Sequence, residues 1–464
     1  MEDKTNRQGR EGKLSRRDFM GAAAAVAAFT VVPRHVLGGA GNTPPSGKLN
    51  IAGVGVGGMG QSNVGKCAEA GENIVALCDV DAKYAAAVFK KYPNARMWTD
   101  FRKMLDEQKD IDAVVVATPD HLHAVVAMAA MQRGKHVYVQ KPLTRTVWEA
   151  RMLTEAARKY KVQTQMGNQG HSSEEVRLVA EWIQDGAIGD VREVHCWTNR
   201  PVWPQGIGRP TDTPPVPEGL DWDLWIGPSP MRPYNPAYLP FNWRAWIDFG
   251  AGALGDMGCH VMDAAFFALK LKYPVSVQAS HSWEVKEMWK RWENKETYPD
   301  AEVVHYQFPA RGKMPPVKLH WYDGGLLPER PDDLEKGRSV PESGTIFIGD
   351  KGKLICDTYS ENPRIFPEVK MKEFTKKRPP KTLRRVAGGV GGHEQDWINA
   401  CKGGPAASSN FDYSGPFTET VVMGNLAVLN PDKVLEWDGE NMRMTNDDAA
   451  NAFVKPDYRA GWSL

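Results

Sequence analysis

The stretch IAGVGVGGMG, residues 51–60, decides the fold of the first part of the chain. An apolar run leads directly into a G-x-G-x-x-G pattern, which is typical of the turn from a first strand into a first helix. In that pattern Gly55 allows the tight turn, Gly57 lets the backbone approach a pyrophosphate, and Gly60 permits close packing of helix on strand. The pattern therefore predicts a dinucleotide site, with the pyrophosphate at the positive end of the helix.

A carboxylate after the next apolar run indicates which dinucleotide is bound. Asp79 lies 24 residues after Gly55 (79 − 55), at the end of the expected second strand. A carboxylate at this place hydrogen-bonds the ribose 2′-hydroxyl and repels a 2′-phosphate, so the sequence favours NAD over NADP. The alternative is a glycine turn in an unrelated α/β fold.

Strand and helix alternate through this part of the chain. The helical stretch 122–133 ends before Gly134, where a C-terminal glycine is expected, and Thr146 with Glu149 forms a capping box for the next helix. This alternation predicts an α/β fold with a doubly wound parallel sheet. Its buried strands are expected at the apolar runs 49–56, 74–80, 111–117 and 136–140.

Composition excludes several classes of protein. The 464 residues suffice for two or three domains, and a net charge of +1 gives no electrostatic footprint for nucleic acid. No later run is long and apolar enough for a membrane helix, so the mature chain is expected to lack an integral membrane segment. The six cysteines form no Cys-x-x-Cys pair, and the histidines have no metal-ligand spacing. We therefore expect neither a disulfide framework nor a metal site.

The first 40 residues read as an export signal. LSRRDFMGAAAAVAAF, residues 14–29, contains Arg16-Arg17 followed by an apolar run that is shorter than the roughly 18–20 residues needed to span a bilayer. This pattern predicts a twin-arginine signal peptide at 1–40, a linker at 41–47, the twin-arginine (Tat) machinery as partner, and a periplasmic or otherwise exported protein. Twin-arginine export carries proteins that are already folded. The alternatives are a basic tail or a signal anchor that is never cut.

The stretch VVVATPDHLHAVVAMAAMQRGKHVYVQKPLT, residues 114–144, is more specific. With residues 220–263 and 344–354, it resembles the glucose–fructose oxidoreductase/inositol dehydrogenase (Gfo/Idh/MocA) family. The resemblance implies an N-terminal NAD-binding Rossmann domain, 48–165, and a C-terminal α/β domain, 166–464, with a large, open, mostly antiparallel sheet. Substrate would lie between that sheet and the nicotinamide. The outer face of such sheets commonly forms dimers or tetramers, so a homodimer or homotetramer is expected.

The resemblance also implies the cofactor residues. The family's Thr-Pro and nearby His match Thr118-Pro119 and His123, and its Glu-Lys-Pro matches 140–142, where Gln140 replaces the usual Glu and removes a negative charge beside the lysine. The expected cofactor-binding set is Gly55, Gly57, Gly58, Met59, Gly60, Asp79, Thr118, Pro119, His123, Gln140, Lys141, Pro142, Asn168 and Gln169.

Hydride transfer from a carbinol requires a base for the hydroxyl proton. Asp256 and His260 stand four residues apart, so on a helix they share a face, and a carboxylate can fix an imidazole tautomer. Family members use this spacing together with the lysine that Lys141 matches. We expect these three residues to be catalytic, with either His260 or Lys141 as principal base. The alternatives are a structural Asp–His contact and a surface lysine in a turn.

Five further residues are candidates for substrate contact. Aromatic rings suit sugars because each offers an apolar face and a polar edge. His171 is expected either to face the substrate or to lie in a solvated loop, whereas His393 is expected to start a helix. The sugar pocket is expected to include Tyr238, Trp243, Arg244 and Asp248.

These residues favour an enzyme, an exported NAD-dependent oxidoreductase acting on a CH–OH group of a sugar or glycoside. Since no dependable NAD supply exists outside the cytoplasm, the cofactor should be tightly bound and recycled internally. One alternative is a redox-neutral, NAD-dependent glycoside-cleaving enzyme that acts through a transient keto-sugar. Another is a non-catalytic sugar-binding protein, against which the intact Lys141, Asp256 and His260 argue.

Overall fold

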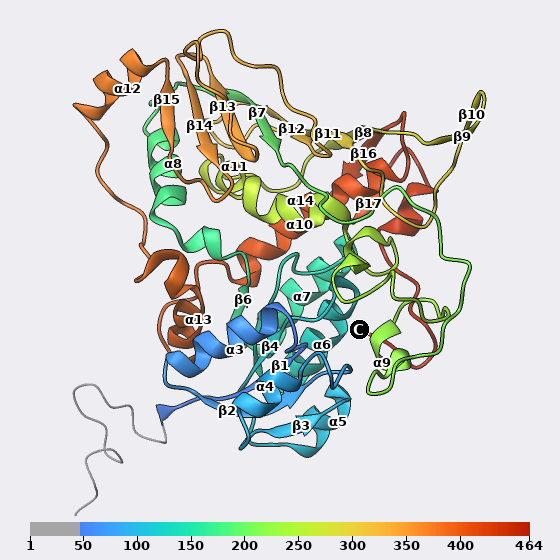
Figure 1. The fold of residues 1–464 in the computed structure, drawn as a ribbon. Helices are drawn as coiled ribbons and strands as arrows, with labels where there is room; N and C mark the ends of the chain where they lie inside the picture. Colours follow the sequence, from blue (N-terminus) through green and yellow to red (C-terminus); the bar gives the residue numbers. More distant parts are fainter. Residues whose placement is uncertain (1–46) are drawn as a thin grey trace, which may run out of the picture. The chain divides into compact units, whose positions relative to one another are not determined.

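The computed structural model describes residues 47–464, and residues 49–464 form one compact unit. The expected signal peptide, 1–40, and all but the last residue of the expected linker, 41–47, lie outside the described residues. The first half of the unit is built on six parallel strands in the order β3-β2-β1-β4-β5-β6 (Figure 1), which confirms the predicted Rossmann sheet. These strands are β1 (Asn50–Val54), β2 (Asn73–Cys78), β3 (Arg96–Trp98), β4 (Ala113–Val116), β5 (His136–Val139) and β6 (Thr164–Met166).

Helices cover both faces of this sheet, because successive strand residues point to opposite sides. Val114 and Val116 pack with one hydrophobic cluster, and Ala113 and Val115 pack with another. The capping box at Thr146 is present, and Gly134 after α6 has a φ of 71°, as expected for a C-terminal glycine. The helices are α3 (Met59–Glu69), α4 (Ala86–Lys91), α5 (Phe101–Glu107), α6 (Asp120–Gln132) and α7 (Val147–Tyr160).

One helix of the Rossmann core comes from much later in the chain. Helix α13 (His393–Cys401) contacts α3, and its Trp397 and Ile398 are fully buried in the cluster that contains Val115. The nucleotide-binding half is therefore not a single stretch of sequence. The domain boundary expected between 165 and 166 stays a prediction.

The second sheet has nine strands in the order β15-β14-β13-β7-β12-β11-β8-β16-β17. Every neighbouring pair is antiparallel except β7 with β12, which confirms the large, mostly antiparallel sheet. A separate hairpin, β9 (Val285–Glu287) and β10 (Lys290–Arg291), extends from it. The nine strands are β7 (Val191–Trp197), β8 (Ser276–His281), β11 (Glu302–Phe308), β12 (Val317–Tyr322), β13 (Gly344–Gly349), β14 (Lys353–Asp357), β15 (Arg364–Phe366), β16 (Val434–Asp438) and β17 (Arg443–Met444).

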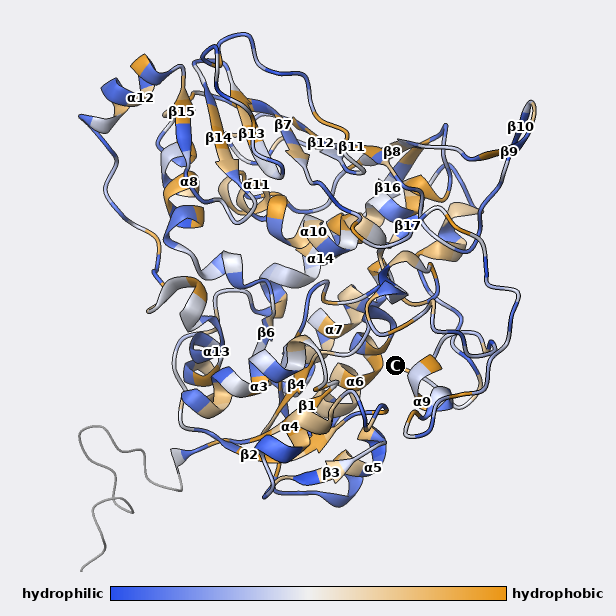
Figure 2. Cartoon of the chain, in the orientation of Figure 1, coloured by the Kyte–Doolittle hydropathy of each residue, from blue (hydrophilic) through white to orange (hydrophobic). Residues whose placement is uncertain are grey.

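Helices lie between the two sheets. Helix α14 (Phe411–Val428) packs against α7 on one side and against β8 and β11 on the other, and α10 (Gly252–Val261) packs on α14. Figure 2 shows central strands of both sheets in hydrophobic colours, in keeping with their burial. The remaining helical elements are α8 (Glu174–Gln184), α9 (Trp222–Ile226), α11 (Asp263–Ala268), α12 (Glu368–Thr375), η2 (Gln169–Ser172), η3 (Asn242–Ala245), η4 (Gly389–Gly392) and η5 (Ala450–Phe453).

Two sequence expectations about composition can be compared with these residues. All six cysteines are free thiols, five of them buried, as expected for small core residues. Within residues 47–464, no helix combines the length and the apolar character that crossing a bilayer requires.

Two glycines of α3 give a matched test of the first turn. A Cβ at Gly60 would overlap the carbonyl oxygen of Gly55, whereas a Cβ at Gly65 would meet only the Lys91 ammonium, at 3.8 Å. We expect Gly60→Ala to destabilise the protein by about 1–3 kcal/mol through overpacking. Gly65→Ala should be neutral or stabilising by up to about 1 kcal/mol, because alanine favours the helix. Urea denaturation of both variants measures the difference, and equal stabilities would contradict the close-packed turn.

Candidate active site

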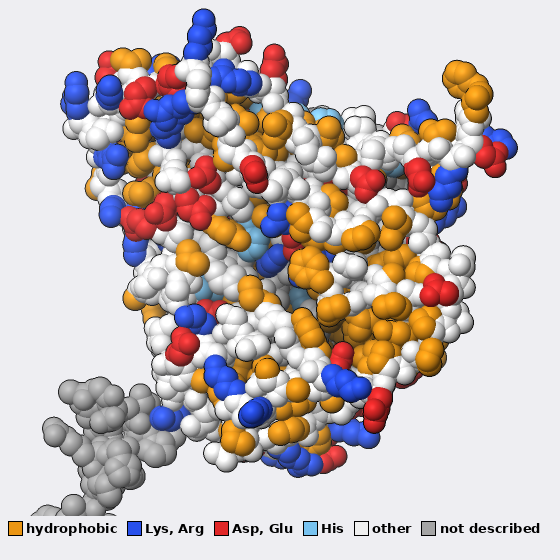
Figure 3. Space-filling model, in the orientation of Figure 1, with side chains coloured by type: hydrophobic (Ala, Val, Ile, Leu, Met, Phe, Trp, Pro, Cys, Tyr) orange, Lys and Arg blue, Asp and Glu red, His pale blue; other side chains and the backbone are white. Residues whose placement is uncertain are grey.

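A cleft of about 400 Å³ opens at the carboxyl edge of the Rossmann sheet. The glycine loop and Lys141 line one side, and Phe241, Trp243 and Arg244 line the other. Figure 3 shows a hollow between the two halves of this face, with charged and histidine side chains in it and hydrophobic side chains beside it. Ligands of open α/β sheets bind at this edge, so the cleft is the candidate active site.

Asp79 accepts hydrogen bonds from the backbone of the glycine loop. One carboxylate oxygen accepts hydrogen bonds from the backbone N–H groups of Val56 (2.8 Å) and Gly57 (3.0 Å), and the other accepts from Asp81 N–H (3.0 Å). Burial raises the pKa of Asp79 while these bonds oppose the rise. The N-cap of α3, Gly58, offers no side-chain cap, and the first turn holds no acidic residue. The N–H groups there are thus left for an anionic ligand, which fits a pyrophosphate.

Unpartnered polar atoms mark the other end of the cofactor region. Among residues 47–464, the Thr118 hydroxyl and the Asn168 side-chain nitrogen are buried without a hydrogen-bond partner. The Asn168 oxygen accepts from the Ser409 hydroxyl at 2.6 Å, and Gln169 donates to the Tyr138 hydroxyl at 3.3 Å. Buried polar groups normally have partners, so the two orphans fit a bound polar group such as the nicotinamide end of NAD.

His123 and Gln140 line the cleft and also hold the residues around it in place. The ring nitrogens of His123 each lie 2.8 Å from a carbonyl oxygen, one of Pro142 and one of Thr118, so the histidine braces the two turns that carry the family motifs. Burial lowers the pKa of His123 to about 4. Gln140 donates to Asn63 on α3 at 2.9 Å. Both residues thus position backbone that borders the cleft.

Lys141 forms an ion pair with Asp256 of α10. The ammonium donates to one carboxylate oxygen and to the backbone carbonyl of Asp256, both at 2.7 Å, and Arg244 donates to the same carboxylate oxygen at 3.2 Å. These cations hold the pKa of Asp256 well below its usual range despite burial. No hydrogen bond joins Asp256 to His260 among the described residues, and both charged donors use the same carboxylate oxygen of Asp256. The expected Asp–His hydrogen bond is therefore replaced by a Lys–Asp–Arg cluster.

His260 stands beside this cluster as a neutral imidazole. It is 7% exposed, and its Nδ1 has no partner within the part of the chain that the structure describes. Burial, followed by the nearby Lys141 charge, lowers the pKa of His260 to about 3, against the attraction of Asp256. A neutral imidazole carries a proton on one ring nitrogen, and its other ring nitrogen can accept one.

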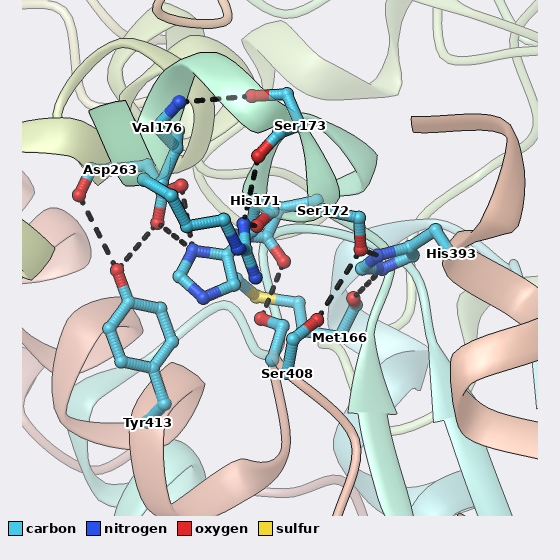
Figure 4. A network of polar contacts seen from close by, with 12 residues as sticks. Met166, His171, Ser172, Ser173, Val176, Asp263, His393, Ser408 and Tyr413 are labelled. Carbon is cyan, nitrogen blue, oxygen red and sulfur yellow. Dashed lines mark hydrogen bonds and ion pairs between the residues drawn. The ribbon is translucent and has the colours of Figure 1, made fainter. Parts of the chain in front are cut away.

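His171 lies in a buried polar network (Figure 4), not in a solvated loop. Its Nδ1 lies 2.9 Å from a carboxylate oxygen of Asp263. The Tyr413 hydroxyl donates to the other carboxylate oxygen of Asp263 at 2.6 Å, and the rings of His171 and Tyr413 stack with their centroids 4.3 Å apart. His393 contacts the Ser172 hydroxyl at 2.6 Å and begins α13, as expected. This network holds η2, the segment that follows β6, in place.

The expected sugar contacts divide into two groups. Trp243 and Arg244 line the cleft, whereas Tyr238 packs against Trp246 at 4.8 Å within a buried aromatic cluster. Asp248 forms an ion pair with the buried Arg232 and does not line the cleft.

Asp120 is a cleft residue that the sequence reasoning missed. Its carboxyl is 3% exposed; one oxygen accepts from Ala251 N–H at 3.1 Å, and the other has no partner among the described residues. Burial raises the pKa of Asp120 to about 7, although the charges of Arg244 and Lys141 lower it. Its position directly after Thr118-Pro119, at the first turn of α6, was the available signal.

The raised pKa of Asp120 predicts a pH-dependent stability. Between the ordinary aspartate value of about 3.9 and about 7, the folded protein keeps a proton that the unfolded chain releases. The free energy of unfolding should therefore contain a component that falls as pH rises through this window. Asp120→Asn should remove that component, measured by urea denaturation at pH 4.5, 6 and 7.5. Asp106→Asn, at an exposed surface ion pair, serves as control. Equal pH slopes for wild type and Asp120→Asn would refute the assignment.

Two family models match the chain. Residues 49–168 match the NAD-binding Rossmann fold of an oxidoreductase family, and residues 191–305 match the C-terminal alpha/beta domain of the same family. The matches fall on the two sheets described above.

Curated relatives cover part of the chain. Levoglucosan dehydrogenase of Pseudarthrobacter phenanthrenivorans is 28% identical over 190 residues, which are 41% of this chain and 40% of that protein. Alpha-N-acetylgalactosaminidase of Shewanella oneidensis is 30% identical over 205 residues, covering 38% of this chain and 44% of that one. Inositol 2-dehydrogenase of Salmonella typhimurium is 30% identical over 146 residues, covering 31% and 43%. The chain thus spans less than half the length of these relatives.

Solved structures share the fold over a longer span. The WlbA dehydrogenase of Bordetella pertussis, in complex with NADH and UDP-GlcNAcA, aligns with a TM-score of 0.57 at 18% identity, covering 84% of this chain and 99% of that one. A levoglucosan dehydrogenase in complex with NADH aligns with a TM-score of 0.54, also at 18% identity, covering 84% and 99%. At this identity the likeness concerns the fold.

Proposed function

Because the chain belongs to the Gfo/Idh/MocA family of NAD-binding oxidoreductases, we propose that it oxidises a CH–OH group of a sugar or glycoside. The observation that carries the proposal is the meeting of Lys141, Asp256 and His260 beside a cleft that the glycine loop also lines. The dehydrogenases among the curated relatives act on levoglucosan and inositol, which are cyclic polyhydroxy compounds, and this supports a substrate of that kind.

The chain's own groups fit NAD, which when bound supplies the acceptor for a hydride. The first turn of α3 would hold the pyrophosphate, and Asp79 the adenosine ribose. Thr118 and Asn168, whose polar atoms lack partners among residues 47–464, would hold the nicotinamide end. A carboxylate at position 79 favours NAD over NADP.

His260 is the proposed base. Lys141 donates two hydrogen bonds to Asp256 as an ammonium and must lose a proton before it can accept one. An ammonium has three N–H donors, so one remains to orient the substrate hydroxyl. The neutral imidazole of His260 can take the hydroxyl proton while the carbinol becomes a carbonyl. Asp256 and Arg244 fix the position of Lys141.

A second candidate is redox-neutral cleavage of a glycoside through a transient ketone, which acidifies the neighbouring C–H and permits elimination. The alpha-N-acetylgalactosaminidase relative favours it, since the same base and cofactor serve both reactions. Incubating the purified protein with a panel of glycosides and weighing the products by mass spectrometry separates the two. Loss of two hydrogens indicates oxidation, and cleavage without a redox change indicates elimination. A protein that alters no member of the panel would support a non-catalytic sugar-binding role.

The base assignment predicts a specific pair of variants. His260→Ala should lower turnover by about 10²–10⁴-fold, the range of general base catalysis, while NAD content is kept. Because the pKa of His260 is about 3, its ring stays neutral near pH 6.5. The pH profile of turnover around pH 6.5 should therefore be the same in wild type and in His260→Ala. Lys141→Ala should also lower turnover. Unlike a loss of the base alone, it should raise the KM as well, because Lys141 orients the substrate hydroxyl. His281→Ala, outside this cleft, is the control. Near-wild-type turnover in His260→Ala would transfer the role to Lys141.

We also propose that the protein is exported by the twin-arginine route with NAD already bound, for which Arg16-Arg17 and the following apolar run are the support. An exported enzyme cannot exchange its cofactor, so it must return the hydride to a second sugar or to its own product. NAD should then co-purify with the protein and survive dialysis, and oxidation of one substrate should stop at about one equivalent of NADH per site unless an acceptor is added. Ultraviolet absorbance at the NADH band follows this directly. Free turnover with added NAD by cofactor-free protein would overturn the proposal.

A further inference from the structure

Tyr359 contacts His260 from the turn between β14 and β15 of the nine-stranded sheet. Its ring stands edge-on to His260, with ring centroids 4.9 Å apart and an interplanar angle of 83°. The same ring packs on Gly170, where an added Cβ would lie 2.9 Å from Tyr359 Cδ1. Gly170 therefore leaves the space that this ring fills, and the tyrosine spans the distance between the segment after β6 and helix α10.

The turn that carries Tyr359 is fixed by its own hydrogen bonds. Tyr359 N–H donates to the Glu361 carboxylate at 2.8 Å, Ser360 N–H donates to Asp357 carbonyl at 3.0 Å, and Asn362 donates to the Asp357 carboxylate at 2.7 Å. These bonds hold the backbone from which the Tyr359 ring projects.

Tyr359 is the most accessible member of the group around His260. It is 38% exposed, against 7% for His260. No group among residues 47–464 accepts a hydrogen bond from its hydroxyl, and burial raises the pKa of that hydroxyl, so it stays a neutral donor. The site thus offers an aromatic surface and an unused donor immediately beside the proposed base.

We propose that Tyr359 is a substrate-binding residue that selects a cyclic sugar: its ring packs against the apolar side of the sugar ring, and its hydroxyl donates to a ring substituent. Ring stacking and a polar tip are the combination that tyrosine brings to amphipathic ligands. This inference rests on the proposed function and names the substrate class of the same site. An open-chain polyol, which presents no rigid apolar face, gains little from such a contact.

The test compares Tyr359→Ala and Tyr359→Phe in the NAD-loaded protein. Tyr359→Ala should raise the KM for the preferred cyclic sugar about tenfold, the size of a lost aromatic contact, with kcat and NAD content close to wild type. Tyr359→Phe keeps the ring and loses one neutral hydrogen bond, so its KM should rise about threefold. Tyr322→Phe, whose hydroxyl contacts His195 at 3.0 Å on β7, is the matched control.

Three outcomes overturn the inference. An unchanged KM in both variants excludes substrate contact, and a fall in kcat together with loss of bound NAD reveals a merely structural tyrosine. A KM for open-chain polyols that rises as much as that for cyclic sugars excludes the selection. Failure of the proposed function is separately visible, because the wild type would then neither oxidise nor cleave any sugar of the panel.

Discussion

The ion pair between Lys141 and Asp256 is the contact on which the site depends. The lysine follows β5 at the edge of the parallel sheet, and the aspartate stands on α10, which packs under the other sheet through α14. Both side chains are largely buried, at 15% and 12% exposure, so each needs its partner to offset the cost of leaving water. The pair therefore fixes how the helix that carries His260 meets the edge that holds the cofactor. Arg244 adds a second cation to the same carboxylate, and its guanidinium packs on the rings of Phe241 and Trp243.

Three buried histidines near this pair are neutral at ordinary pH. Burial lowers the pKa of His123, His260 and His393 alike, yet they do different work. His123 and His393 have their ring nitrogens close to backbone or side-chain partners, whereas the Nδ1 of His260 has none among the described residues. What sets His260 apart from the other two histidines is therefore the missing partner, not the pKa.

Local sequence signals predicted the local structure well. The glycine loop, the Thr146 capping box and the four buried strands all depend on periodicity or on residues close in the chain, and all are present. The family resemblance predicted that Lys141, Asp256 and His260 share one site, but it did not predict the ion pair between Lys141 and Asp256. What the sequence did not reveal depends on distant partners. Asp256 accepts from Lys141, 115 residues away, in preference to its neighbour His260, and His171 meets Asp263 across 92 residues. Tyr359 had no local pattern to mark it, and the only local signal for Asp120 was its place directly after Thr118-Pro119.

Helix α13 gives the nucleotide-binding half an unusual dependence on the order of synthesis. Its Glu394 accepts from Asn63 on α3 and from Tyr138 on β5, and its Trp397 fills the core beneath that helix. A ribosome that has made only the six parallel strands has made α3 and α4 on this face but not α13, which completes the cluster. A chain that ends before residue 393 would lack Trp397, whose ring packs edge-on against Tyr138 of β5 at 5.7 Å, so the core of the parallel sheet depends on residues made long after its last strand.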